Sequence, residues 1–251
     1  MPVFLASFKL CLFLIHLVYF LLSHIVLTLV VRDEKRRLRL IVKSNAFHAT
    51  LVMKYLGLES FYEENLEKVK GKLITCNHLS YLDVLVLFTR YPALFITSRE
   101  IEQTPVLGWI TKLAGCFFVE RRKELRTPEQ AEKEMALMRQ RLSEGFNIFL
   151  FPEGTSSDGK TVLSFKAHFF QLAIDSKSYL QPVVVKYHGA NRDLAPWYGD
   201  MTFLPHFWKV CTQKNFSIGI HQLPKISPDG KDKFQLKDEA HKAILEAYER
   251  Y

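Results

Sequence analysis

Residues 3–31 form an almost uninterrupted apolar run in which Lys9 is the only charged residue. A helix of about 20 apolar residues is already long enough to cross a bilayer. The run is too long for a signal-peptide core, and no small-residue cleavage pattern follows it. A buried core helix is the alternative, but such a helix seldom keeps this length without a polar face. We therefore predict a membrane-associated helix, and the sequence is compatible with a helix that spans the bilayer or lies in one leaflet.

A basic cluster follows the apolar run at Arg32, Lys35, Arg36, Arg37 and Arg39. Such a cluster favours the cytoplasmic face and anionic lipid head groups, which would be the inner membrane if the source is bacterial. The formal net charge of +8 suits a partner that carries phosphate. The apolar N-terminus favours a membrane over a nucleic acid as that partner.

Residues 40–58 repeat apolar side chains at helical spacing and are predicted as an amphipathic helix that lies on the membrane or on the following domain. We expect residues 1–58 to form the membrane-associated helices and residues 59–251 the α/β domain. The four cysteines form no C-x-x-C pair. Neither a disulfide framework nor a metal site is predicted, and no cofactor is expected.

From about residue 70 the chain alternates short apolar runs with longer amphipathic ones, which predicts a mostly parallel central sheet flanked by helices. The predicted strands are 72–76, 92–97, 115–120, 146–151 and 180–187. The predicted helices are 81–90, 101–113, 128–144, 164–177 and 236–250. Residues 197–208 are predicted as an aromatic-rich loop that covers the sheet. Binding sites in such sheets lie beyond the carboxyl ends of the strands, so the residues after each strand are the candidates.

His78 and Asp83 follow the first predicted strand and are five residues apart. On one continuous helix they would not share a face. They can meet only if His78 lies in the loop and Asp83 lies in the first turn of the next helix. Asp83 would then fix the imidazole tautomer and leave the other nitrogen free to take a proton. The alternative is that Ser80 and Asp83 form a capping box without any chemistry.

The fourth predicted strand is followed by a polar loop at residues 151–160, which reads Phe-Pro-Glu-Gly-Thr-Ser-Ser-Asp-Gly-Lys. Residues 154–161 also fit the phosphate-binding pattern of P-loop nucleotidases. That pattern requires a helix to begin at Lys160 and Thr161, whereas the helical run begins only near Phe165. Glu153 would also place a carboxylate where phosphate should lie. A P-loop nucleotidase is therefore a weaker alternative.

Taken together, these motifs resemble the 1-acyl-sn-glycerol-3-phosphate acyltransferase family of glycerophospholipid acyltransferases. The family pattern N-H-x-S-x-x-D matches residues 77–83, and the pattern F-P-E-G-T-R-S matches residues 151–157 except at Ser156. A strand that ends in arginine matches residues 115–121, and a proline in a late apolar strand matches residues 182–185. The resemblance covers about residues 40–210.

The resemblance implies that His78, oriented by Asp83, deprotonates a lysolipid hydroxyl, which attacks the thioester of acyl-ACP or acyl-CoA. The expected acceptor is 1-acyl-sn-glycerol-3-phosphate, and the expected setting is a membrane, without nucleic acid. The residues expected to bind the substrates are Asn77, Ser80, Arg99, Arg121, Glu153, Gly154, Thr155, Ser156, Ser157 and Lys166.

Two departures from the family pattern concern the acceptor. Ser156 stands where the family usually has arginine, and Ser98 stands where many members have lysine. Both missing cations would bind phosphate, and the candidates to replace them are Arg99, Arg121, Arg122, Lys160 and Lys166. The alternative is a different lysolipid, such as lyso-ornithine lipid. A non-catalytic membrane adaptor that uses the basic cluster is a third interpretation of the chain.

Overall fold

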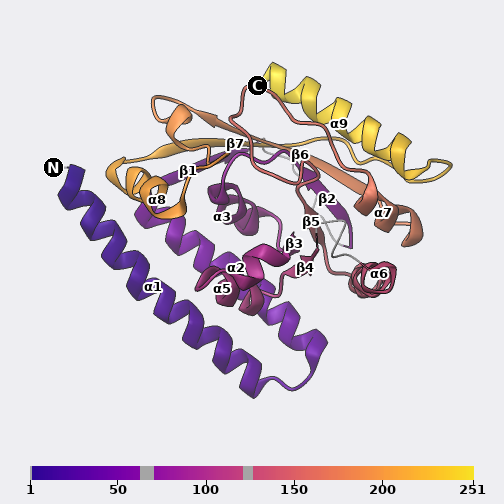
Figure 1. Cartoon of the computed structure of the whole chain (residues 1–251), viewed down its shortest axis with the longest axis horizontal. Helices are drawn as coiled ribbons and strands as arrows, with labels where there is room; N and C mark the ends of the chain where they lie inside the picture. The colour runs from indigo at the N-terminus through magenta and orange to yellow at the C-terminus, as the bar shows by residue number, and fades with distance from the viewer. Residues whose placement is uncertain (1, 63–70, 121–126) are drawn as a thin grey trace.

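The computed structural model describes residues 2–62, 71–120 and 127–251, and its centre is a sheet of seven strands (Figure 1). The strands are β1 (Leu58–Tyr62), β2 (Leu73–Cys76), β3 (Leu94–Ser98), β4 (Phe117–Val119), β5 (Ile148–Leu150), β6 (Leu180–His188) and β7 (Phe216–Gln222). Their order in the sheet is β1-β7-β6-β2-β5-β3-β4. All neighbours are parallel except β6 and β7, so β7 and β1 run against the other strands. The mostly parallel sheet is confirmed.

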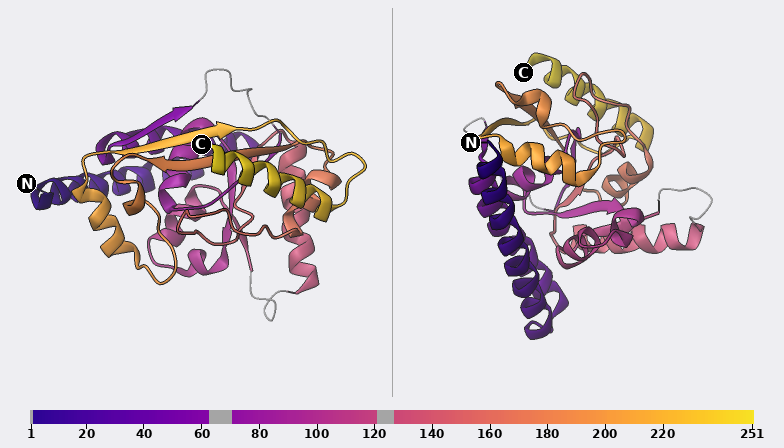
Figure 2. Two further views of the ribbon diagram at one scale, coloured as in Figure 1. Left: turned by 90° about the horizontal axis from the view of Figure 1, so that it is seen from above. Right: turned by 60° about the vertical axis from the view of Figure 1, so that its left-hand side comes forward.

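Helices cover both faces of the sheet. The longer ones are α1 (Pro2–Val30), α2 (Glu34–Leu56), α3 (Tyr81–Arg90), α6 (Pro128–Ser143), α8 (Phe203–Thr212) and α9 (Lys233–Arg250). The shorter ones are α4 (Arg99–Gln103), α5 (Leu107–Leu113) and α7 (Gln171–Asp175), with 3₁₀ turns η1 (His168–Phe170) and η2 (Arg192–Leu194). Contacts join α1, α2, α3, α5 and α8 into one layer, and they join α6, α7 and α9 through η1 into the other (Figures 1 and 2).

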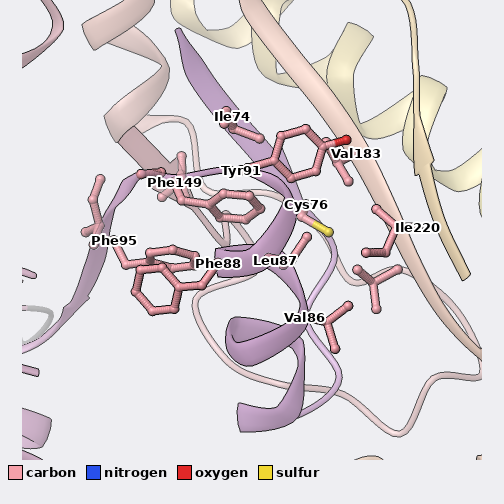
Figure 3. Packing of buried hydrophobic residues seen from close by; sticks show 14 of the residues in the cluster. Ile74, Cys76, Val86, Leu87, Phe88, Tyr91, Phe95, Phe149, Val183 and Ile220 are labelled. Atoms are coloured by element: carbon pink, nitrogen blue, oxygen red, sulfur yellow. The ribbon is translucent and has the colours of Figure 1, made fainter. Parts of the chain in front are cut away.

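The core lies where α3 packs on the middle of the sheet, as Figure 3 shows. Phe95 and Phe149 come from neighbouring strands, and their rings stack at 4.7 Å. Phe88 of α3 packs on Phe95 at 4.4 Å, and Val86 and Leu87 are fully buried. Strands in a parallel sheet are buried on both faces, which explains why the central strands are continuous apolar runs.

Within the first helical layer, α1 and α2 form an antiparallel pair (Figures 1 and 2). Within the described residues, α1 is the one helix whose length and apolar composition would allow it to cross a membrane, and only 11% of its most apolar window is buried. Its single charge, Lys9, is nevertheless buried. The ammonium donates to Leu56 O at 2.7 Å and to Gln213 O at 2.6 Å. Lys9 therefore binds the carbonyl-rich ends of α2 and α8, where a cation is favoured.

Several predicted elements differ from the structure. The predicted helix 101–113 is interrupted between α4 and α5, where Val106 takes a positive φ of 67°. The predicted helix 164–177 shrinks to η1 and α7. The sequence also missed β1 and β7, and residues 203–212 form α8 instead of an aromatic loop. Pro205 is compatible with this helix because it stands in the first turn of α8, where a missing N–H costs nothing.

Candidate active site

The candidate site lies at the carboxyl ends of three neighbouring strands, β2, β5 and β3. His78 follows β2, Glu153 follows β5, and Ser98 ends β3. Because these strands are parallel and adjacent, segments about 75 residues apart in sequence meet at one edge of the sheet. The candidate site therefore lies at the carboxyl ends of the strands, as expected, and His78 and Glu153 meet there.

His78 and Asp83 are in direct contact. His78 Nδ1 lies 3.0 Å from Asp83 Oδ2, and the Asp83 side chain is fully buried. The His78 side chain keeps 20% of its surface exposed, and its ring stacks on Phe151 at 4.0 Å. No described residue hydrogen-bonds to His78 Nε2. A carboxylate on Nδ1 places the ring proton there, so Nε2 is the nitrogen that can accept a proton.

Asp83 is both a helix cap and the partner of His78. Ser80 is the N-cap of α3, and its hydroxyl accepts the N–H of Leu82. Asp83 Oδ2 accepts the N–H groups of Ser80 at 2.9 Å and Leu79 at 2.7 Å. The capping box and the imidazole contact therefore use the same oxygen. The structure therefore contains both arrangements that the sequence allowed, the capping box and the contact of His78 with Asp83.

Glu153 and Ser157 hold the main chain of His78 from both sides. Glu153 Oε1 accepts the His78 N–H at 2.8 Å, and Ser157 N–H donates to His78 O at 2.9 Å. Burial raises the pKa of Glu153 to about 7, and the nearby charge of Asp83 acts in the same direction. The N–H groups of His78 and Leu163 oppose that rise because they favour the carboxylate.

Asn77 and Tyr187 connect this loop to β6. Asn77 donates to Val185 O at 2.8 Å and accepts from Val185 N at 2.9 Å, so its amide extends the pairing of β2 with β6. Tyr187 then reaches Asp83, and its hydroxyl donates to Asp83 Oδ1 at 2.6 Å. The sequence gave no indication of Tyr187, because 104 residues separate it from Asp83 and only the strand order joins them.

The loop after β5 does not adopt the geometry of a phosphate-binding P-loop. No helix begins at Lys160 or Thr161, and the next helical turn is η1. Lys160 pairs with its neighbour Asp158 at 3.0 Å and is largely exposed. The carboxylate of Glu153 also occupies the start of the loop. The helix that the nucleotidase alternative requires is therefore missing from this described segment.

The predicted phosphate-binding cations differ in how close they lie to the loop of the family motif. Arg99 pairs with Glu102 at 3.2 Å and Glu134 at 3.4 Å, and it lies outside the cavity that His78 lines. Lys166 is exposed and packs over Gly154, where an added Cβ would lie 2.5 Å from Nζ. Arg121 lies outside the described residues. Of the two described cations, only Lys166 is beside the loop that carries the family motif.

Thr155 and Ser156 line the cavity beside His78. The Ser156 hydroxyl donates to Trp197 O, and Trp197 N donates to Leu79 O at 2.8 Å. The main chain at Trp197 thus joins the loop after β2 to the loop after β5. Ser98, which replaces the family's lysine, also lines this cavity and is buried.

His78 opens into a cavity of about 480 Å³ that extends between α1, α2, α3, α5 and α8. Its apolar walls include Phe13, Leu17, Val52, Leu85, Ile110 and Phe207. Elongated apolar ligands are favoured in such a space, because burying each methylene group contributes about 0.8 kcal/mol. The cavity therefore fits a hydrocarbon chain whose reactive end lies at His78.

A chain of hydrogen-bonded histidine, serine and asparagine side chains, which we call the seam chain, lies between α1 and α2. Its members are His16, Ser23, His24, Asn45 and His48. Contacts of 2.9–3.2 Å join His16 to His48, His48 to Ser23, Ser23 to His24 and His24 to Asn45, and Asn45 donates to Ala114 O at 2.9 Å. His16, Asn45 and His48 line the cavity.

The seam chain also contacts the main chain. Asn45 Nδ2 donates to Ala114 O, and Asn45 Oδ1 accepts from His24 Nε2. The Ser23 hydroxyl donates to Phe20 O at 2.9 Å, so its oxygen accepts from His48 Nε2, and His48 Nδ1 lies 3.1 Å from His16 Nε2. Burial lowers the pKa of His48 to about 4, and His16 and His24 act in the same direction. The chain therefore holds neutral imidazoles.

Among the described residues, no group of three or more His, Cys, Asp or Glu side chains is placed to hold a metal ion.

Comparisons with known proteins converge on one family. A family model described as Acyltransferase matches residues 58–186. A 1-acyl-sn-glycerol-3-phosphate acyltransferase of Neisseria gonorrhoeae is 31% identical over 71% of this chain and 69% of its own length. A lyso-ornithine lipid O-acyltransferase of Rhodobacter capsulatus is 33% identical over 55% of this chain and 50% of its own length.

Among solved structures, the fold is similar to the 1-acyl-sn-glycerophosphate acyltransferase PlsC of Thermotoga maritima, with a TM-score of 0.72. The match covers 98% of this chain and 94% of the other at 17% identity. At that identity the likeness concerns the fold, and it includes the N-terminal helices.

Proposed function

Because the chain belongs to the acyltransferase family and is an O-acyltransferase, we propose that His78 is the general base that activates a lysolipid hydroxyl. The observation that carries the proposal is the contact between His78 Nδ1 and the buried Asp83 carboxylate, which leaves Nε2 without a described partner in a ring that lines the cavity. A histidine held in this way needs no serine or cysteine nucleophile when the substrate supplies the attacking oxygen.

In the proposed reaction, His78 Nε2 takes the proton of the acceptor hydroxyl as its oxygen bonds to the thioester carbonyl carbon. The Asp83 carboxylate stabilises the imidazolium that forms. The tetrahedral intermediate then expels the thiolate, and His78 returns the proton to that sulfur. The products are an ester and a free thiol, and the enzyme regains its starting protonation state. General base catalysis of this kind contributes roughly 10²–10⁴-fold.

We place the acyl chain of a thioester donor in the apolar cavity, with its carbonyl at His78. The cavity supports this placement because its lining is largely apolar and because the same cavity contains His78, Gly154 and Thr155 at its polar part. The donor is acyl-ACP or acyl-CoA, since both present a fatty acyl thioester.

The proposed acceptor is 1-acyl-sn-glycerol-3-phosphate, the acceptor in the name of the Neisseria relative. Lys166 over Gly154 is the described cation best placed to bind its phosphate. The second candidate is lyso-ornithine lipid, the acceptor in the name of the Rhodobacter relative. The pairing of Arg99 with Glu102 and Glu134 favours this candidate, because Arg99 then does not supply the cation that the family pattern has at Ser98 or Ser156.

We further propose that the enzyme acts at the cytoplasmic face of a membrane, held there by α1. Large apolar side chains along α1 are exposed, among them Phe4, Phe8, Val18, Leu22 and Leu29. The basic cluster after residue 31 would then lie against anionic head groups.

The test is acylation by the full-length protein in lipid vesicles, with each acceptor and with acyl-ACP or acyl-CoA. We expect product with wild type and a loss of at least about 10³-fold in His78→Ala, in line with the removal of a general base. His241→Ala is the matched control, because it removes a partly buried histidine of α9 outside the cavity. Undiminished activity of His78→Ala would refute the proposed base.

The acceptor is tested separately with Lys166→Gln and Lys160→Gln. We expect Lys166→Gln to raise KM for the phosphate acceptor about fivefold, a typical size for an exposed charge-assisted contact. Lys160→Gln should leave that KM unchanged, since Lys160 is bound to Asp158. If the two variants behave alike and lyso-ornithine lipid is the better acceptor, the second candidate replaces the first.

A further inference from the structure

The Asp83 carboxylate is held on both oxygens by groups that donate hydrogen bonds. Oδ2 accepts from His78 Nδ1 and from the N–H groups of Leu79 and Ser80. Among the described residues, the donor to Oδ1 is the Tyr187 hydroxyl, at 2.6 Å. Both side chains are buried, so water does not replace this bond.

We infer that Tyr187 is a positioning residue for acyl transfer, which acts on His78 through Asp83. The inference rests on the role proposed above for His78. Without the Tyr187 hydroxyl, Oδ1 would be a buried anionic oxygen with no described donor. The carboxylate could then twist about its Cβ–Cγ bond, which would misalign its contact with the imidazole. Tyr187 holds the carboxylate plane at the angle that directs Oδ2 to Nδ1.

The fold supplies this contact from a distance. The pairing of β2 with β6 ends at Cys76 and Val183, and the Asn77 amide carries it on to Val185. Tyr187 is two residues further along the strand, so it shares a face with Val185 and reaches the first turn of α3. The loop that presents His78 is thereby fixed to the strand that presents Tyr187.

Other titratable groups also face Asp83. Cys76 ends β2, Glu153 follows β5, and Tyr248 comes from α9, and each interacts electrostatically with the Asp83 charge. None of the three donates a hydrogen bond to Asp83 in the described structure. The pKa of Tyr187 is raised well above its ordinary value by burial and by the Asp83 charge, so the hydroxyl stays protonated and remains a donor.

The experiment compares Tyr187→Phe with Tyr91→Phe. Tyr91 is an equally buried tyrosine whose hydroxyl donates to Gln222 at 3.1 Å, away from the site. We expect Tyr187→Phe to lower kcat about tenfold with less than a twofold change in KM, since a hydrogen bond to a charged group contributes about 1.5 kcal/mol or more. Tyr91→Phe should leave kcat within twofold of wild type.

The pH profile separates positioning from packing. Loss of the donor concentrates negative charge on Asp83, which favours the protonated base, so the acid limb of kcat/KM should move to higher pH in Tyr187→Phe. Tyr187→3-fluorotyrosine keeps the shape and strengthens the donor, so it should move the same limb to lower pH. This second variant keeps the test informative if Tyr187→Phe folds poorly.

A double-mutant cycle with Asp83→Asn completes the test, because residues that act through one another are not additive. Tyr187→Phe should add less than twofold to the loss caused by Asp83→Asn. A normal kcat and an unmoved pH profile in both Tyr187 variants, beside an impaired Asp83→Asn, would overturn this inference alone. Full activity of Asp83→Asn would overturn the proposed base pair and this inference with it.

Discussion

His78 lines the same cavity as His16 and His48 of the seam chain, and these histidines differ in the groups that contact their ring nitrogens. At the strand ends, His78 has a buried carboxylate on Nδ1 and no described partner on Nε2. In the seam chain, His48 has Ser23 on one nitrogen and His16 on the other, and the chain ends on the Asn45 amide. The residue type is the same, and the partners decide whether a ring can take up a proton.

The seam chain disfavours an added proton, because burial lowers the pKa of His48 and no described carboxylate hydrogen-bonds to the chain. His78 is different because Asp83 stabilises its cation and Nε2 is unoccupied. The comparison indicates that the seam chain holds α1 to α2 and α5, while chemistry is confined to His78.

The strongest test of this comparison exchanges the Asp83 carboxylate for an amide and the Asn45 amide for a carboxylate. Asp83→Asn should lower kcat by about 10³-fold or more, because the amide cannot stabilise the imidazolium and can favour the wrong tautomer. The measurement is initial acylation rate at saturating donor. Circular dichroism should show an intact fold, since the Asn amide oxygen can still accept the N–H groups of Leu79 and Ser80. A loss below tenfold would mean that Asp83 serves α3 as a cap and little else.

The reverse exchange, Asn45→Asp, should affect stability more than chemistry. The new carboxylate would face Ala114 O at a site that is 3% exposed, so we expect a loss of about 3 kcal/mol in the free energy of unfolding. Urea denaturation measures it. Asn191→Asp is the matched control, because Asn191 donates to the carbonyl of Asn215 at the surface, where a change within about 0.5 kcal/mol is expected. Equal midpoints for the two variants would contradict the structural role of the seam chain.

The two regions were not equally predictable from the sequence. The pairing of His78 with Asp83 followed from their spacing and from the strand–loop–helix pattern around them, because the partners are local. The seam chain was hidden, since His16 and His24 lie in a run read as apolar and His48 in a stripe read as amphipathic. Its members meet only because α1 turns back on α2, which periodicity within each helix cannot reveal.

The same distinction between local and distant partners explains which other elements were predicted and which were missed. The helix 81–90 and the strand ends near residues 76, 98 and 150 were predicted, because local caps and short apolar runs set them. β7 was missed although its apolar residues alternate with small and polar ones. β1 was missed because only Leu58 of Leu58–Tyr62 belonged to a predicted element, the amphipathic helix 40–58. Arg99 was expected at the site, yet Glu134, 35 residues away, holds it elsewhere.

The smallest expected effect is a pH dependence of opposite sign in the two regions. Folding raises the pKa of Glu153 from 4.5 to about 7, so the folded state binds more protons and stability falls as pH rises through this window. Folding lowers the pKa of His48 from 6.5 to about 4, so stability rises with pH between those values. In wild type the two trends oppose each other between about pH 4.5 and 6.5, and burial also lowers the pKa of His188 and His206, which adds to the rising trend.

Single variants should uncover each trend. Relative to wild type, the stability of Glu153→Gln should rise by about 2 kcal/mol from pH 4.5 to 6.5, because the falling limb is removed. Relative to wild type, the stability of His48→Phe should fall by a similar amount over the same range. Urea titrations at half-unit pH steps measure both, and the double variant should restore the wild-type slope. Deviations from wild type that have the same sign in the two single variants would show that these buried groups do not control the pH dependence. The contrast between a seam that excludes protons and a site that can hold one would then lose its energetic basis.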